Sequence, residues 1–445
     1  MKKEIDMLHG SIADKILQFA IPLAITGILQ QVFNACDVMV VGRFASKNAM
    51  AAVGSNSPIV GLMVNLFVGI SLGANVTIAR YIGQERPKDV KKAVHTAIII
   101  SIVSGIVVGI FGICMSKPLL TLMGVPEEVF PMALAYLRIY LCGLPVIFLY
   151  NFEAAIFRSC GDTRTPLLCL IAAGIINVLL NLFFVIGLHR NADGVAIATV
   201  ISNAFSAILM FILLKRSKQV IHVDLSAFRI DPHVLRVILR IGLPAGLQSM
   251  VFSFSNIIIQ SAINSLGADV MAASSAAFNV EIFAYFIVNA FGQACTTFIG
   301  QNNGAGNRER CVRITRIAYL MDLVATICIS TIILIFAQKI LWFFNEDSAV
   351  ISYGLTRVKF ITYFQVINAT IEVFSGTLRG YGNSLAPALI ALICICGSRI
   401  VWVYTAFAAD PRFEKLLVCY PLSWCITAVV LILYYLKFKK GRVEN

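Results

Sequence analysis

Long apolar segments recur along the whole chain, and their length decides what it can fold into. A helix needs about 20 consecutive apolar residues to cross the roughly 30 Å hydrocarbon core of a bilayer. Segments of this length alternate here with short polar connections, and only 13% of the residues are charged. A soluble domain carries about 25% charged residues, so too few charges remain to cover this apolar surface in water. The sequence predicts an all-α integral membrane protein.

Twelve segments are long enough to span the bilayer, and their even number places both termini on one side of it. Most of the 36 Lys and Arg residues lie before the first span, in the loops after every second span, or after the last span. Because such basic segments stay in the cytoplasm, we expect both termini there and the spans in the cell (inner or plasma) membrane. The expected spans are about 16–41, 50–72, 93–115, 132–152, 165–187, 194–214, 239–263, 270–294, 314–337, 355–377, 384–408 and 414–436.

The two halves of the chain repeat one another. Pro22 corresponds to Pro244, and FRSCGDTRTP (157–166) corresponds to LRGYGNSLAP (378–387), with nearly the same separation in both cases. Since each repeat has six spans, we expect two six-helix lobes related by a pseudo-twofold axis along the membrane normal, with the substrate path between them. The expected domains are an N-terminal lobe at 1–214, a basic cytoplasmic linker at 215–238 and a C-terminal lobe at 239–445.

Several functional classes lack the motifs that they require. There is no GxxxxGK[ST] sequence for ATP, the five histidines form no HExxH, and the twelve cysteines form no CxxC pair. The basic residues make no aromatic-interleaved face of the kind that binds nucleic acid. We therefore expect no enzyme activity, no metal site, no cofactor and no nucleic-acid partner, and a receptor without transport activity has no supporting feature.

Asp37 lies within the first expected span, where an ionisable residue costs about 2.5–3.5 kcal/mol on insertion scales. Gln30, Asn34 and Asp37 follow one another at helical spacing and form one polar stripe. A carboxylate in a medium of low dielectric constant can bind a cation or exchange a proton. The alternative is a carboxylate held permanently by hydrogen bonds as a packing element. We favour a coupling site, with these candidate partners on neighbouring spans: Asn151, Asn177, Asn181 and Thr199.

The internal repeat provides a comparison for this stripe. The seventh span has Ile259 at the position of Asp37, although Asn256 matches Asn34. A purely structural stripe would be expected to be more symmetric. The sequence therefore predicts that the coupling chemistry is concentrated in the N-terminal lobe.

The C-terminal lobe has polar and charged candidates of its own for a substrate cavity or a charge network. Gln365, Asn368 and Glu372 form a stripe on the tenth span. Arg399 on the eleventh span is most simply explained by a fixed ion pair with Glu372 or Glu281. Glu372 itself has two interpretations, one as a charge that attracts a cationic substrate or coupling ion, the other as a structural residue. Asp322 is expected to be a packing or hydrogen-bonded acid. Glu153, near the cytoplasmic end of the fourth span, is expected to be a satisfied charge at the membrane interface.

The motif R-x-x-G-[DN]-x-x-x-P after the fourth and tenth spans, together with FAIPLAITGILQQVFNACDVMVVGRF in the first span, identifies a resemblance. The chain resembles the multidrug and toxic compound extrusion (MATE) transporters over nearly its full length. The resemblance implies a monomer that exports cationic or amphipathic drugs in exchange for inward H⁺ or Na⁺ by alternating access.

Individual positions extend this resemblance to the family's damage-inducible branch. Asp37 matches the first-span aspartate of that branch, and Pro22 matches its bending proline, although a proline can also simply lie near a helix start. Asn151, Asn177 and Thr199 resemble the partners of that aspartate, and the resemblance implies the same roles for them here. Where some members have a second aspartate, this chain has Asn181, and no seventh-span glutamate of another branch is present.

The leading hypothesis is therefore a secondary active multidrug efflux antiporter. The alternative is a flippase for a lipid-linked oligosaccharide or a peptidoglycan precursor. Such flippases usually have additional spans and a strongly basic cavity, whereas the spans here offer mainly Arg399. Both H⁺ and Na⁺ suit a carboxylate with Asn and Thr neighbours, and the single acid in the N-terminal lobe slightly favours H⁺.

Overall fold

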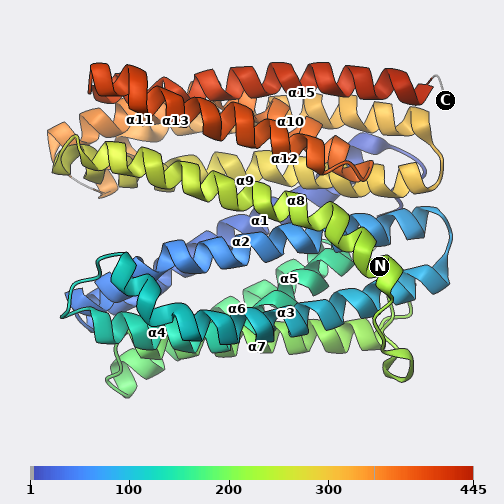
Figure 1. The fold of residues 1–445 in the computed structure, drawn as a ribbon, viewed down its shortest axis with the longest axis horizontal. Coiled ribbons are helices and arrows are strands. Elements are labelled where there is room, and N and C mark those ends of the chain that lie inside the picture. Colours follow the sequence, from blue (N-terminus) through green and yellow to red (C-terminus); the bar gives the residue numbers. More distant parts are fainter. Residues whose placement is uncertain (1–4, 345, 444–445) are drawn as a thin grey trace. The chain divides into compact units, whose positions relative to one another are not determined.

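The computed structural model describes residues 5–344 and 346–443. Its secondary structure there is helical, and each expected span coincides with one helix or with consecutive helical segments (Figure 1). Ten of the described spans are long and apolar enough to cross a membrane, and a bent pair adds an eleventh. The twelfth is α11 (Ser348–Gly380), which is long enough but carries buried polar residues such as Gln365 and Glu372. The predicted all-α membrane fold is confirmed.

The chain forms two compact units, of which the first comprises Ile25–Gly246 together with Ile5 among the described residues. Its complete helices are α2 (Lys47–Gly83), α3 (Pro87–Leu122), α4 (Phe130–Cys142), α5 (Leu144–Ser159), α6 (Arg164–Leu182) with the π-helical turn η1 (Phe183–Gly187), and α7 (Ala192–Arg216). Helices α3 and α2 both pack against α5, and α7 packs against α4, α5 and α6. Glycine allows a close backbone contact between helices, because a Cβ atom at Gly69 would lie 2.2 Å from the Cα of Gly246.

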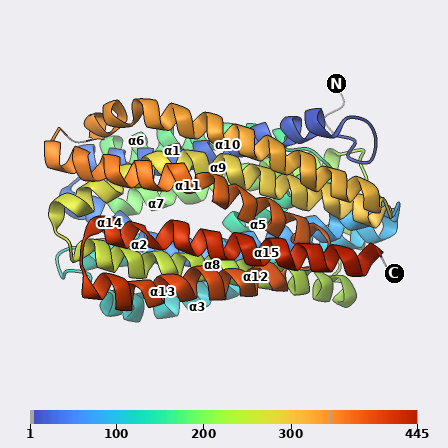
Figure 2. The ribbon, with the colours of Figure 1, turned by 90° about the horizontal axis from the view of Figure 1, so that it is seen from above.

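The second unit comprises Asp6–Ala24 and, within the described chain, residues from Leu247 onward. Three long helices, α9 (Ala268–Gly304), α10 (Arg308–Phe344) and α11, pack against one another (Figure 2). Helix α15 (Cys419–Val443) packs against α11, and the short α14 (Phe413–Leu417) precedes it. The eleventh span is α-helical only in parts, because two π-helical segments interrupt it. Its segments are α12 (Leu385–Ala391), η3 (Leu392–Gly397), α13 (Ser398–Trp402) and η4 (Val403–Phe407).

The first helix of each half is divided between the two units. In α1 (Ile12–Phe44), residues up to Ala24 belong to the second unit, where Phe19 contacts Phe298 with ring centroids 5.7 Å apart. In α8 (Pro232–Asn264), residues up to Gly246 belong to the first unit. The boundaries of the two compact units therefore fall inside these two helices and not at the boundary between the sequence repeats. In each helix the last residue before the change of unit lies two residues after a proline, Pro22 or Pro244.

The fourth expected span is broken into two helices. The axes of α4 and α5 differ by 49° at Gly143.

The linker between the two halves of the sequence is hydrogen-bonded to the third span. The Asp224 N–H donates to Nε2 of His95 at 3.1 Å, and the Asp231 N–H donates to the Thr96 hydroxyl at 3.0 Å. The linker, which includes the 3₁₀ turn η2 (Leu225–Ala227), is thus fixed to the start of α3.

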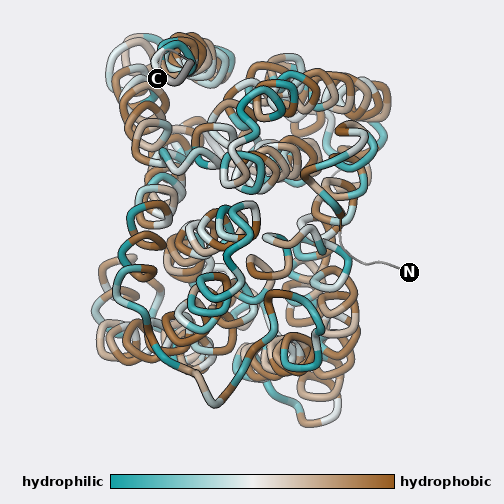
Figure 3. Tube along the Cα trace, turned by 90° about the vertical axis from the view of Figure 1, so that its right-hand side faces the viewer, coloured by the Kyte–Doolittle hydropathy of each residue, from teal (hydrophilic) through white to brown (hydrophobic). Residues whose placement is uncertain are grey.

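Hydropathy varies along the chain as a membrane protein requires. The helices are mostly hydrophobic, whereas hydrophilic residues gather in the connecting segments (Figure 3). Many large apolar side chains on the spans are exposed, Val107 at 60% and Leu179 at 61% among them. In a bilayer such side chains contact lipid, so their exposure needs no protein partner. The twelve cysteines are all free.

Candidate cation-coupling site

Asp37 lies in the second half of α1, inside the first unit, and its side chain is buried at 8% exposure. Nδ2 of Asn181 donates to its Oδ1 at 2.6 Å, and the Thr199 hydroxyl lies 3.3 Å from its Oδ2. Nδ2 of Asn181 also donates to Oδ1 of Asn177 at 3.2 Å. The structure therefore brings together four of the residues that the sequence analysis selected, from α1, α6 and α7.

The Thr199 hydroxyl has a single proton but two acceptors within reach. It lies 2.9 Å from the Val195 carbonyl oxygen as well as 3.3 Å from Oδ2 of Asp37. When Asp37 is ionised, the hydroxyl can donate to the carboxylate. When Asp37 is protonated, the hydroxyl can donate to Val195 and accept the proton of the carboxyl group. The site thus offers a hydrogen-bonding arrangement for either protonation state.

Close helix packing positions this site. Phe33, one turn before Asp37, lies against Gly174 on α6, and a Cβ atom at Gly174 would be 1.9 Å from Cζ of Phe33. A larger residue at this position would force the Phe33 ring to move. The contact lies about one turn of α6 before Asn177, so α1 and α6 approach closely next to the site.

Two sequence candidates do not join the hydrogen bonds of Asp37. Asn34 is exposed and makes no hydrogen bond within the described chain, and Nδ2 of Asn151 donates to Ile147 of its own helix at 2.8 Å. Two tyrosines on α4, Tyr136 and Tyr140, lie in the neighbourhood of Asp37 without hydrogen-bonding to it in the described chain. Sequence reasoning missed them, since aromatic residues are common in membrane spans and no pattern distinguishes these two.

In the second unit, Glu281 pairs with Arg357, so the prediction that it could pair with Arg399 is wrong. Arg357 on α11 holds Glu281 in a bidentate pair, with Nε–Oε1 and Nη2–Oε2 distances of 3.1 and 3.2 Å. Both side chains are less than 10% exposed. Arg357 was not selected from the sequence because it lies near an end of its expected span, where basic residues are ordinary.

Arg399 makes none of the ion pairs that the sequence analysis expected, within the described residues. Its Nε donates to the Ser423 hydroxyl at 3.2 Å, and its Nη1 donates to Oδ1 of Asn256 at 3.5 Å. Its guanidinium group lies over the Tyr420 ring, 4.6 Å from the centroid. Neutral oxygens and an aromatic face therefore stabilise this buried cation.

Glu372 is buried at 8% exposure, and its carboxylate makes no hydrogen bond or ion pair within 4 Å in the part of the chain that the structure describes. It faces Gly292 on α9, where a Cβ atom would lie 3.2 Å from its Oε2. Gln365 is also buried, and Asn368 is half-buried. These three remain candidates for the C-terminal lobe, since nothing in their contacts assigns them a structural role.

Two acids expected to be satisfied by hydrogen bonds are not fully so. Neither carboxylate oxygen of Glu153, a residue with 0% exposure, has a partner among the described residues. Oδ1 of Asp322 accepts from the Thr326 hydroxyl at 3.2 Å, whereas its Oδ2 has no such partner. The expectation is therefore wrong for Glu153 and half right for Asp322.

Known proteins resemble this chain over most of its length. It is 27% identical over 431 residues to the probable multidrug resistance protein YoeA of Bacillus subtilis (strain 168), covering 94% of this chain and 92% of that protein. It is 26% identical over 394 residues to the probable multidrug resistance protein NorM of Thermotoga maritima, covering 87% and 84% of the two chains.

A solved structure has the same fold. It is an outward-facing conformation of a multidrug resistance MATE family transporter of the MOP superfamily, with a TM-score of 0.92 at 21% identity and 100% coverage of both chains. A family model described as MatE matches residues 22–183 and again residues 244–405, as a duplicated chain should. Since these two segments make up well over half of the sequence, the protein belongs to the MatE family, which confirms the resemblance found in its motifs.

Proposed function

We propose that this protein is a secondary active multidrug efflux antiporter that exports cationic or amphipathic compounds in exchange for H⁺, with Asp37 as the proton-carrying residue. One observation carries the proposal. Asp37 is buried within a membrane-spanning helix, and its described hydrogen-bond partners, Asn181 and Thr199, are both neutral. A buried carboxylate without a cationic partner is costly when ionised, so it favours binding a cation or a proton.

The names of the relatives support the drug-export part of this proposal, since two of them are probable multidrug resistance proteins. The geometry around Thr199 supports the proton, because the hydroxyl can serve both states of the carboxyl group. Oxygen atoms of Asn177, Asn181 and Thr199 can also ligate Na⁺, so the experiment must separate the two ions.

The flippase alternative is less well supported by the described charges. Such a protein needs a basic site for the diphosphate of its lipid-linked substrate. Arg357 is already paired with Glu281 at 3.1 Å. Arg399 and Arg379 are buried and donate to neutral oxygens, Arg379 to Oε1 of Gln248 at 3.4 Å. No contact among the described residues brings these two arginines together as a diphosphate site would require.

The test is ethidium transport in proteoliposomes under a proton gradient alone or a sodium gradient alone. We expect the proton gradient to drive transport and Asp37→Asn to reduce it to the background of empty liposomes. Asp269→Asn, which removes an exposed acid from the first turn of α9, is the matched control and should transport normally. Full transport by folded Asp37→Asn would refute the coupling role, and transport driven only by sodium would replace H⁺ with Na⁺.

A further inference from the structure

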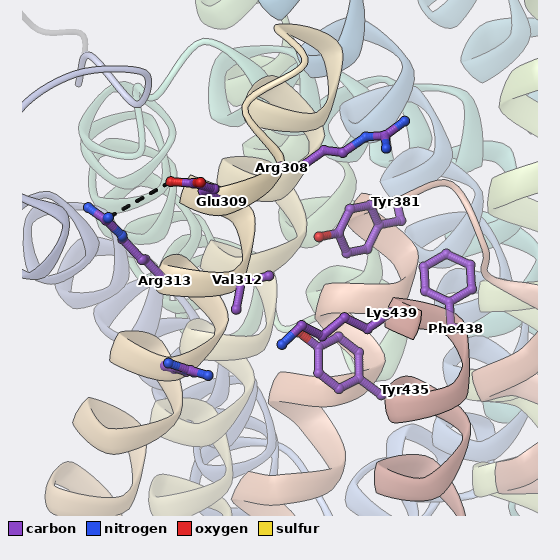
Figure 4. A pocket seen from close by; sticks show the side chains of 9 residues that line it. Arg308, Glu309, Val312, Arg313, Tyr381, Tyr435, Phe438 and Lys439 are labelled. Atoms are coloured by element: carbon purple, nitrogen blue, oxygen red, sulfur yellow. Dashed lines mark ion pairs between the residues drawn. The ribbon is translucent and has the colours of Figure 1, made fainter. Parts of the chain in front are cut away.

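A pocket of about 330 Å³ lies entirely within the second unit, between the start of α10, the end of α11 and the end of α15 (Figure 4). It has no part in the proposed coupling site, whose residues are all in the first unit. Figure 4 shows Lys439 and two tyrosines opposite the side chains of α10. The lining residues are Arg308, Glu309, Val312, Arg313, Arg316, Tyr381, Tyr435, Phe438 and Lys439.

The polar part of this pocket is strongly basic. Four of its lining side chains are Arg or Lys, and Glu309 is the single acid among them. Glu309 pairs with Arg313 at 3.9 Å, but the two side chains are 93% and 71% exposed, so solvent screens this pair. Arg316 and Lys439 form no ion pair among the described residues, and they suit a phosphate group, which Arg binds through several N–H donors and Lys binds as a point charge.

The other part of the pocket is aromatic and rigid. The rings of Tyr381 and Phe438 have centroids 5.5 Å apart, and Tyr435 is only 7% exposed. The Tyr435 ring packs against Phe374 at 5.1 Å. A free phosphate ion gains nothing from such a wall, whereas the glycerol and upper acyl carbons of a lipid do. Tyrosines at this position are also typical of the headgroup level of a membrane.

The position of the pocket along the helices agrees with the headgroup level. Helix α10 has 37 residues and is therefore about 55 Å long, well beyond the roughly 30 Å of hydrocarbon. Arg308 lies in its first turn and Arg316 in its third, and Lys439 lies in the last two turns of α15. The ends of both helices extend past the apolar core of the membrane, and the long side chain of Arg316 can extend to the same level. These basic groups can therefore reach lipid phosphates.

We propose that this pocket binds the phosphate headgroup of an anionic membrane lipid, with phosphatidylglycerol-type or cardiolipin-type chemistry. Arg316 and Lys439 contact the phosphate, and the aromatic wall contacts the adjoining apolar part of the lipid. Basic pockets between spans on the cytoplasmic side are suited to such headgroups. Under the expected orientation, the lipid belongs to the cytoplasmic leaflet.

The test is thermal unfolding of the purified full-length protein in neutral detergent with added phosphatidylglycerol or, separately, phosphatidylcholine. We expect phosphatidylglycerol alone to raise the unfolding temperature. In Arg316→Gln/Lys439→Gln, the apparent affinity for this lipid should fall at least about tenfold. Lys215→Gln/Lys218→Gln removes two exposed charges from the end of α7 and the linker, outside the pocket, and should keep the wild-type affinity.

Three results would overturn the proposal. Equal loss of affinity in the pocket and control variants would mean that the lipid is attracted only by overall charge. Equal stabilisation by inorganic phosphate would mean a phosphate site rather than a lipid site. Unchanged affinity in the pocket variant would mean that the lipid binds elsewhere. Ethidium transport by the pocket variant checks that it is folded, and Arg316→Lys, which keeps the charge, should retain most of the affinity if the double variant fails to fold.

Discussion

Thr199 provides a direct test of proton exchange at Asp37, because its hydroxyl lies within reach of both Asp37 and Val195. Thr199→Val removes the hydroxyl while keeping the shape of the side chain. The ionised carboxylate then loses a hydrogen bond worth about 1.5–3 kcal/mol, which is more than the neutral carboxyl group loses. We expect the pH midpoint of transport to rise by about one to two units, whereas Thr199→Ser should leave it in place. A midpoint that is the same in all three proteins would exclude this role.

Glu281 and Glu372 form a matched pair of buried acids on neighbouring helices, one paired and one not. Glu281→Gln leaves the buried Arg357 without its counter-charge, and breaking such a pair costs about 3–5 kcal/mol. Glu372→Gln breaks no described hydrogen bond or ion pair, so its effect should stay below about 1 kcal/mol. Thermal unfolding in detergent compares them. Similar losses of stability in both variants would contradict this distinction.

The sequence predicted some site residues and not others for a physical reason. Asp37, Asn181 and Thr199 are polar groups in apolar spans, and their insertion cost marks them individually. Their pairing, and that of Glu281 with Arg357, depends on which helices become neighbours and on their rotation. A periodic pattern within one helix shows neither its neighbours nor its rotation about its axis. The sequence therefore suggested Arg399 as the partner of Glu281, whereas the structure has Arg357.

At the scale of elements, Asp231 at the end of the linker caps the start of α8 and forms an ion pair with α3. Its carboxylate accepts from the N–H groups of His233 and Val234 at the start of α8, and it lies 3.5 Å from Nζ of Lys92 on α3. The hydrogen bond from Val234 is the main cause that lowers the pKa of Asp231 below its ordinary value. The cap is therefore complete above that ordinary value, about 3.9, and is lost as the pH falls through the lower, folded-state value.

Asp231→Ala should destabilise the start of α8 by about 1 kcal/mol, because a capping acceptor is removed. Asp231→Asn should keep most of this contribution, since Asn is a good capping residue, and should also remove its dependence on acid pH. Hydrogen exchange of the linker and of the first turn of α8 measures both effects. If exchange in the Ala variant is as slow as in the wild type, the cap does not hold the linker.

The breaks in the helices show where local sequence is insufficient. The expected span 132–152 is divided at Gly143, where a Cβ atom would lie 2.4 Å from Cγ2 of Val200 on α7. Pro145 follows in the first turn of α5, a position that proline favours. Glycine and proline occur within many spans, so the bend follows from the contact with α7, which the apolar pattern alone does not contain.

At the scale of the whole molecule, the main untested prediction is the orientation in the membrane. One span, α7, separates Asn191 from Ser217, so these two residues must lie on opposite sides. The basic residues place Ser217 in the cytoplasm with both termini, and they place the lipid pocket at the same surface.

Cysteine labelling tests this orientation. After replacement of the four exposed cysteines, Cys114, Cys142, Cys328 and Cys425, a single cysteine is introduced at Asn191 or at Ser217. A membrane-impermeant maleimide should label Asn191→Cys in intact cells, and it should label Ser217→Cys only after permeabilisation. The parent without introduced cysteines gives the background. The reverse pattern would invert the whole molecule, so that drug export and the leaflet of the bound lipid would both have to be reassigned, while the contacts of Asp37 would be unaffected.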